Sequence, residues 1–133
     1  MAVTLYTSTG CSSSRKARVW LEDNHIPFIE RNLDTDKITR EEIQHLLVLS
    51  ERGFDDIVSV RSKAYLRLGV TPDDLTTAQM INLILHDPHL LRRPIIVDER
   101  RVQIGFHPDE IRRFLPRDVR AMALQQAQLL AGF

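Results

Sequence analysis

The chain contains one cysteine, Cys11, in 133 residues. A single cysteine excludes an internal disulfide and any zinc site built from several cysteines, and it suits a reducing compartment. The sequence also lacks a long apolar run, and residues 1–6 lack a basic segment. We therefore expect neither a signal peptide nor a membrane span, and we expect a cytoplasmic protein.

Net charge is also absent, because 18 basic side chains balance 18 acidic ones. A neutral chain is a poor candidate for an autonomous nucleic-acid-binding protein. The charge is nevertheless uneven, since residues 92–133 carry eight arginines and only five acids. With 43% hydrophobic and 27% charged residues, the composition predicts one globular domain spanning residues 1–133.

The pattern along the chain predicts an α/β protein. Residues 3–6 and 26–32 read as strands around a helix that ends near residue 24, which is a βαβ unit with a parallel strand pair. Residues 39–90 read as a helical insertion that starts with a capping box at Thr39 and Glu42. Within it, Gly53 is expected as a left-handed cap just past the first helix, and further helices are expected at 63–68 and 76–86.

The last third of the chain predicts a β-hairpin and two helices. Residues 94–97 and 101–105 are the expected strands, with a turn at 98–100. Pro108 is expected in the first turn of a helix that reaches residue 114, and residues 119–131 read as a final amphipathic helix. This order is typical of a thioredoxin-like mixed four-stranded sheet with helices inserted in the middle.

Cys11 lies at the expected start of the first helix. Unpaired amides and the positive end of the helix dipole favour a thiolate there, and Arg15 can lean back toward the same point. A small apolar residue in a loop is the alternative reading. Ser14 occupies the position of a second cysteine, so chemistry that needs a resolving cysteine is excluded.

Pro94 opens the third predicted strand. In thioredoxin-like folds the proline at this point is commonly cis and faces the active cysteine, which would direct the Arg93 guanidinium at Cys11. An arginine beside a thiol suits the binding of an oxyanion.

Several motifs resemble one known family. Cys-x-x-x-Arg, "RSKAYLRLGV" and "LLRRPIIVDE" are similar to the arsenate-reductase superfamily. The segments "RNL", "VQIG" and above all "DEIRRFLPRDVR" resemble its transcriptional branch, the Spx regulators, over essentially residues 3–130. The chain differs from the usual Spx pattern in having Cys-x-x-Ser in place of Cys-x-x-Cys.

The resemblance implies a global transcriptional regulator that binds the C-terminal domain of the RNA polymerase α subunit and modulates stress-response transcription. Degradation by the ClpXP protease is implied as well. Gly53 matches the glycine at which the α subunit docks, where a missing side chain permits close approach. Arg61 and Arg93 match pocket arginines, which with Arg15 make an expected anion pocket around a redox-sensing Cys11.

Departures from the reductase branch argue against enzymatic activity. Thr7 replaces a histidine before the cysteine loop, and His107 replaces a third pocket arginine. A thiol-dependent reductase, either arsenate-reductase-like or monothiol-glutaredoxin-like, remains the alternative function. Regulation by abundance, sensing by Cys11 alone through glutathione or sulfenic acid, and simple blocking of activators at the α subunit also remain open.

No cofactor or metal is expected, because the histidines show no metal-ligand spacing; His86 and His89, which flank Pro88, are expected on the solvated surface. Promoter DNA is expected as a partner only together with RNA polymerase, through the arginines crowded near the chain's end. This expected DNA-phosphate face consists of Arg92, Arg100, Arg101, Arg112, Arg113, Arg117 and Arg120, with Arg93 beside them.

Overall fold

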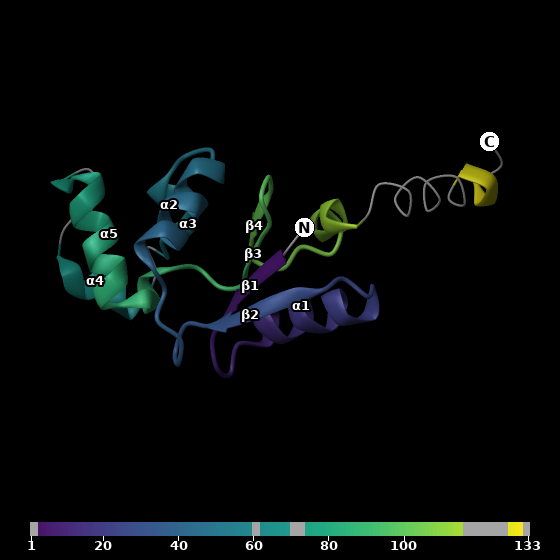
Figure 1. Cartoon of the computed structure of the whole chain (residues 1–133), viewed down its shortest axis with the longest axis horizontal. Helices are drawn as coiled ribbons and strands as arrows, with labels where there is room; N and C mark the ends of the chain where they lie inside the picture. Colours follow the sequence, from purple (N-terminus) through teal and green to yellow (C-terminus); the bar gives the residue numbers. More distant parts are fainter. Residues whose placement is uncertain (1–2, 60–61, 70–73, 116–127, 132–133) are drawn as a thin grey trace.

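The computed structural model describes residues 3–59, 62–69, 74–115 and 128–131. A mixed four-stranded sheet lies at its centre, in the order β2-β1-β3-β4 (Figure 1). The strands are β1 (Val3–Thr7), β2 (Phe28–Asn32), β3 (Ile95–Val97) and β4 (Val102–Ile104). β2 is parallel to β1, whereas β3 is antiparallel to both β1 and β4. The predicted thioredoxin-like sheet, with its parallel pair and its hairpin, is confirmed.

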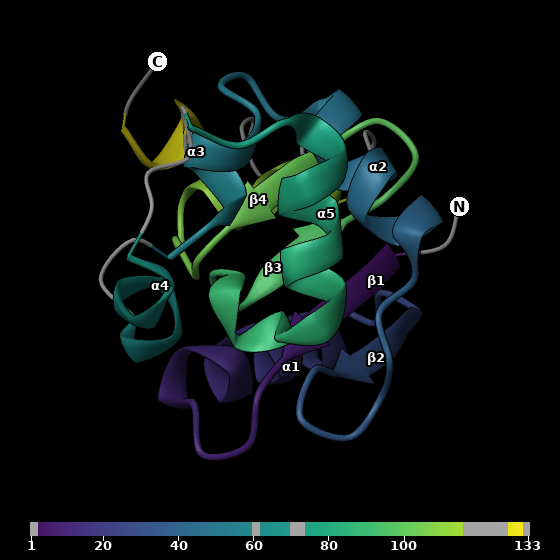
Figure 2. The ribbon, with the colours of Figure 1, turned by 90° about the vertical axis from the view of Figure 1, so that its left-hand side faces the viewer.

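Helices cover both faces of this sheet. Helix α1 (Ser12–Asp23) connects β1 to β2 and lies on one face. The segment between β2 and β3 lies on the other face, where α5 crosses in front of β3 (Figure 2). That segment contains α2 (Arg40–Leu49), α3 (Phe54–Ile57), α4 (Lys63–Leu68), α5 (Thr77–His86) and the 3₁₀ helix η2 (Pro88–Leu90). This is the predicted helical insertion.

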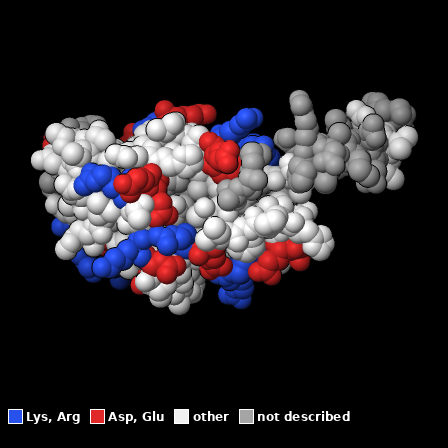
Figure 3. Space-filling model, in the orientation of Figure 1, with Lys and Arg blue, Asp and Glu red and all other residues white. Residues whose placement is uncertain are grey.

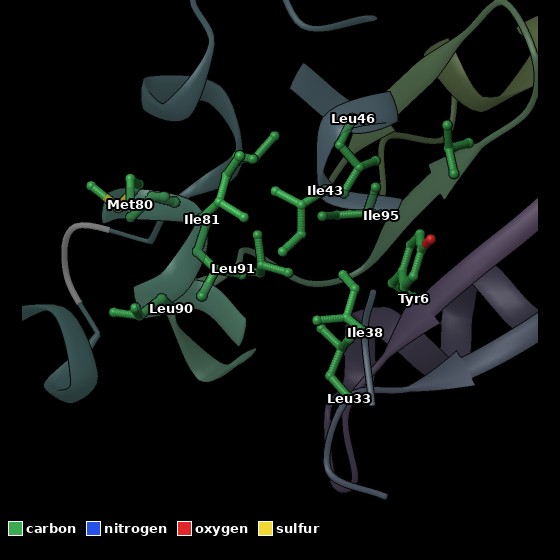
Figure 4. Close-up of a cluster of buried hydrophobic side chains, with 14 residues drawn as sticks. Tyr6, Leu33, Ile38, Ile43, Leu46, Met80, Ile81, Leu90, Leu91 and Ile95 are labelled. Atoms are coloured by element: carbon green, nitrogen blue, oxygen red, sulfur yellow. The ribbon is translucent and has the colours of Figure 1, made fainter. Parts of the chain in front are cut away.

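Alternation along β1 divides the hydrophobic core in two. Leu5 points toward α1 and contributes to a cluster with Leu21 and Ile96. Tyr6 points to the opposite face, into the larger cluster that joins the sheet to α2, α5 and η2 (Figure 4). Burial of apolar surface on both faces fixes the register, because a shift of one residue would exchange the two faces.

The predicted starts of α2 and α5 are confirmed. Thr39 caps α2 with its hydroxyl on the Glu42 amide, and the Glu42 carboxylate accepts the Thr39 amide in return. Thr76 makes the same reciprocal box at the start of α5. Gly69 ends α4 in the left-handed conformation.

Two local predictions are wrong. Helix α2 already ends at Leu49, and Gly53 instead precedes the unpredicted short helix α3, with φ +65° and ψ −128°. The reason is Asp56, whose carboxylate accepts the amides of residues 51 and 52 and so forms a separate turn. Residues 110–114 form the 3₁₀ helix η3 (Glu110–Phe114) rather than an α-helix begun by Pro108. The predicted helix at 119–131 lies mostly outside the described residues.

Candidate functional site: a thiol pocket and an arginine groove

The loop of residues 8–11 carries the cysteine from the end of β1 to the start of α1. Cys11 is the N-cap residue of α1, and its sulfur accepts the Ser14 amide at 3.4 Å. Its carbonyl also accepts the first helical hydrogen bond, from the Arg15 amide at 3.2 Å. The predicted placement of Cys11 at the helix start is therefore confirmed.

This environment acidifies the thiol. Partial burial raises the pKa of Cys11, but hydrogen bonding outweighs burial, so the pKa lies below its ordinary value. The groups that favour the thiolate are the side chain and amide of Ser14, the amide of Ser13 and the side chain of Ser8. A lowered thiol pKa increases the fraction of reactive thiolate near neutral pH.

Cys11 opens into a pocket of about 790 Å³. The cysteine loop forms one wall, and the segment that leads into β3 forms another, with Arg92 and Arg93. Ser59, the end of β4 and His107 complete the lining. Three potential cations therefore share a pocket with one acidic thiol.

Arg93 has a buried hydrogen-bond donor that is unused in this pocket. The Arg93–Pro94 peptide bond is cis, as predicted. The Nη1 atom of Arg93 is buried and has no hydrogen-bond partner among the described residues. An unsatisfied buried donor is costly, and a bound anion or the Cys11 thiolate would supply the missing acceptor.

Arg92 is held differently. Its Nε donates to the Val58 carbonyl at 3.1 Å, and its Nη2 donates to the Asp55 carbonyl at 3.4 Å. These contacts tie the side chain to the end of α3, between the thiol pocket and a second groove. The sequence placed Arg92 only on the DNA-phosphate face, because adjacent residues of an irregular segment carry no signal of which way each side chain points.

The other expected pocket arginines are not brought to the thiol by the described structure. Arg15 is exposed and is not among the residues that line the pocket. Arg61 lies outside the described residues. In the described part of the chain, the basic side chains that line the thiol pocket are thus Arg92 and Arg93, with His107.

Thr7 has a structural role. It is completely buried, and its hydroxyl donates to Glu30 at 2.9 Å. Arg18 binds the same carboxylate through two nitrogens, at 2.5 and 2.7 Å, and its hydrogen bonds are the main cause of a lowered Glu30 pKa. Thr7 therefore supplies no acid or base to the pocket, which weakens the reductase alternative.

The second groove, of about 470 Å³, collects most of the described arginines of the expected DNA-phosphate face. Arg92, Arg100, Arg101 and Arg113 line it together with Arg52, which the sequence analysis did not select. Glu51, Asp55 and Asp56 also line it, so its charge is mixed. On the face drawn in Figure 3, basic and acidic side chains likewise lie interspersed.

The remaining predicted arginines lie elsewhere. Arg112 is exposed and does not line the groove, and Arg117 and Arg120 are outside the described residues. Among the residues the structure describes, no group of His, Cys, Asp or Glu side chains could hold a metal ion. No helix in the described ranges is both long and apolar enough to cross a membrane.

Comparison with known proteins places this architecture in a family. A model of the ArsC family matches residues 6–114. A global transcriptional regulator Spx of Enterococcus faecalis is 50% identical over 130 residues, covering 98% of each chain. One from Bacillus subtilis is also 50% identical, covering 98% of this chain and 99% of its own.

Solved structures agree on the fold. An ArsC-family related protein from Bacteroides fragilis has a TM-score of 0.74 at 28% identity, covering 86% of this chain and 98% of its own. An arsenate reductase from Vibrio cholerae has a TM-score of 0.69 at 26% identity, with coverage of 86% and 98%. The mixed four-stranded sheet with its helices is thus an ArsC-like architecture. The chain belongs to the ArsC family and, within it, to the Spx group of global transcriptional regulators.

The lowered thiol pKa gives a first prediction. The rate of Cys11 alkylation by iodoacetamide, followed against pH, should show an apparent pKa below the model-peptide value of about 8.5. Ser14→Ala removes a hydroxyl that favours the thiolate, so the apparent pKa should rise and the rate at neutral pH should fall.

Ser12→Ala is the matched control, because Ser12 is exposed in the same helical turn and does not contribute to the thiol pKa. Its profile should follow the wild-type curve. Equal effects of the two substitutions, or a wild-type pKa at the model-peptide value, would contradict the assignment.

Proposed function

We propose that this chain is a global transcriptional regulator that binds the C-terminal domain of the RNA polymerase α subunit and modulates stress-response transcription. The observation that carries the proposal is identity of about half over nearly the full length of proteins named global transcriptional regulator Spx. Residues 1–133 act as one arsenate-reductase/Spx-like domain in this proposal. The protein works in the cytoplasm, where it meets the polymerase.

The proposed docking point is the corner at Gly53. A Cβ placed on Gly53 would meet no atom within 4 Å, so the space above this residue is open to a partner. Val48, on the neighbouring helix α2, is 80% exposed and offers apolar surface nearby in sequence. A corner without a side chain, with open space above it, fits close approach by another protein domain.

Gly53→Arg should weaken binding of the isolated α C-terminal domain at least about tenfold, because it adds bulk and charge at the contact. Isothermal titration calorimetry with the full chain measures this, and the wild-type protein should bind with 1:1 stoichiometry. Absence of binding by the wild-type chain would refute the proposed function.

Gly69→Arg controls for the bulk and charge of the added side chain. Gly69 has the same φ of +65°, and its Cβ would also meet no atom within 4 Å. Circular dichroism melting of both variants reports any loss of folding. Equal loss of α-domain binding in the two variants, at equal stability, would remove Gly53 from the docking surface.

DNA contact is proposed through the arginine groove. Arg100 is exposed and has no ion pair among the described residues, while Arg101 lies 3.8 Å from Asp98 and Arg113 lies 3.9 Å from Glu110. The Arg113–Glu110 pair is long and exposed, so it contributes little and exchanges readily for phosphate, whereas Arg101 is half-buried beside the buried Asp98. The acids in the groove keep this affinity low, so the α domain must supply the local concentration.

We expect no binding of promoter DNA by the protein alone at physiological salt and a salt-sensitive complex when the α domain is present. Arg100→Ala should reduce the slope of log affinity against log salt by about 0.9, the value for one lost phosphate contact. Fluorescence anisotropy of labelled DNA measures the slope.

Arg67→Ala, in the exposed last turn of α4 and outside the groove, should leave the slope unchanged. A slope that does not respond to Arg100→Ala would exclude this groove residue from phosphate contact. Nanomolar binding by the free protein would instead indicate an independent DNA-binding repressor.

Cys11 is proposed as a single-thiol redox sensor, with Arg93 stabilising the thiolate or an oxidised sulfur. Oxidation by glutathione disulfide transfers one glutathionyl group to the Cys11 sulfur and releases one reduced glutathione. Arg15 and Arg61 remain predicted members of the anion pocket. Degradation by ClpXP also remains a prediction from the family.

Arsenate turnover should be negligible, because Thr7 is buried against Glu30 and the described pocket lacks a third arginine. A coupled assay with glutathione and glutaredoxin measures this, with the Vibrio cholerae arsenate reductase as positive control. Turnover of about 1 per second or faster would favour the alternative function, a thiol-dependent reductase.

A further inference from the structure

His89 lies between two carboxylates. Its Nε2 is 2.5 Å from Asp34 Oδ1, and its Nδ1 is 3.2 Å from Asp87 Oδ1. The first contact joins residues 55 positions apart, and so links the turn after β2 to η2. His89 is expected from the sequence on the solvated surface, and its side chain is 53% exposed, but both ring nitrogens make contacts with carboxylates.

Asp34 also holds the loop in front of Cys11. Its second oxygen, Oδ2, accepts the Thr9 amide at 2.7 Å, and this bond is the main cause of a lowered Asp34 pKa. Asn32 reinforces the contact, because its side-chain amide donates to the Thr9 hydroxyl at 3.3 Å. The Asp34 carboxylate therefore connects the loop of residues 8–11 to η2, which carries His89.

The two contacts of His89 require a particular protonation state. A neutral imidazole has one N–H and one lone pair, and an ionised carboxylate only accepts hydrogen bonds. Both contacts are hydrogen bonds only when the ring carries two protons. Loss of one proton leaves a nitrogen lone pair facing a carboxylate oxygen, so that contact becomes repulsive.

The charged groups around His89 come from several elements. Histidine side chains ordinarily change charge between about pH 5 and 8. Asp34 stays ionised throughout that range because its pKa is lowered. The helices packed on η2 carry Lys63 and Arg67 on α4 and His86 on α5, and within the described residues none of these forms an ion pair with His89.

We propose that Asp34 and His89 form a proton-dependent clamp on the loop that precedes Cys11, closed when the His89 ring carries two protons and relaxed when it carries one. The clamp regulates the accessibility of the thiol, and in this consequence it rests on the proposed sensing role of Cys11. The closed clamp needs no contact beyond those already described, because Asp34 contacts both His89 and the Thr9 amide.

Amide hydrogen exchange of the ¹⁵N-labelled full chain tests the clamp. After correction for intrinsic exchange, Thr9 protection should fall about fivefold between about pH 5.5 and about pH 8, the size expected for one weakened hydrogen bond. His89→Gln should hold Thr9 at the low level at both pH values. Asp34→Asn should lower protection further, because the charged acceptor is lost.

His86→Gln is the matched control, since it removes a nearby exposed histidine that has no contact with Asp34. It should keep the wild-type pH response. A pH response that survives His89→Gln, or is absent from the wild-type chain, would overturn the clamp. The rate of Cys11 alkylation by iodoacetamide should differ between the wild-type chain and His89→Gln only at the lower pH. The same ratio of the two rates at both pH values would overturn the link to the thiol.

Calorimetry with the α C-terminal domain on the same samples separates this inference from the proposed function. Wild-type protein that fails to bind the α domain refutes the proposed function, whereas the Thr9 exchange data decide the clamp independently.

Discussion

Strand β1 is the element on which the rest of the structure depends. It is the inner strand that pairs with both β2 and β3, and its residues alternate between the two hydrophobic clusters. Tyr6 lies opposite Ile95 in the antiparallel ladder, so the end of β1 meets the start of β3. The cysteine loop follows that end directly, and Arg93 precedes that start. The ladder that organises the core thereby also brings Cys11 and Arg93 to one pocket.

The pocket contains an imbalance of hydrogen-bonding groups. Ser14 and its neighbours favour a negatively charged sulfur, while Arg93 retains a buried nitrogen without an acceptor. Arg92, by contrast, is already bound to carbonyls at the end of α3. Arg93 thus has an unused buried donor in the pocket that Cys11 also lines, and a negatively charged sulfur or a small anion would supply its acceptor.

Aspartate side chains fix the loops around the thiol pocket and the arginine groove. Asp98 accepts the amides of residues 100 and 101 and so fixes the hairpin turn that bears two arginines. Asp56 forms the turn before Gly53 in the same way. Asp34 differs because its acceptor groups join distant segments, the cysteine loop and the His89 turn. An aspartate carboxylate that accepts hydrogen bonds from backbone amides fixes the conformation of a loop that has no hydrophobic core of its own.

The features that depend on local interactions could be predicted from the sequence alone. Capping boxes, apolar periodicity and the βαβ order depend on residues a few positions apart, so they determined the sheet, most helices and the position of Cys11 at a helix start. The boundary near Gly53 was misplaced because the deciding hydrogen bonds come from Asp56, which follows the glycine. The tertiary structure alone decided that Arg92 also lines the thiol pocket, that Arg52 joins the groove, and that His89 meets Asp34. These are contacts between segments far apart in the chain, and their partners are set by how the sheet and helices pack rather than by any local pattern.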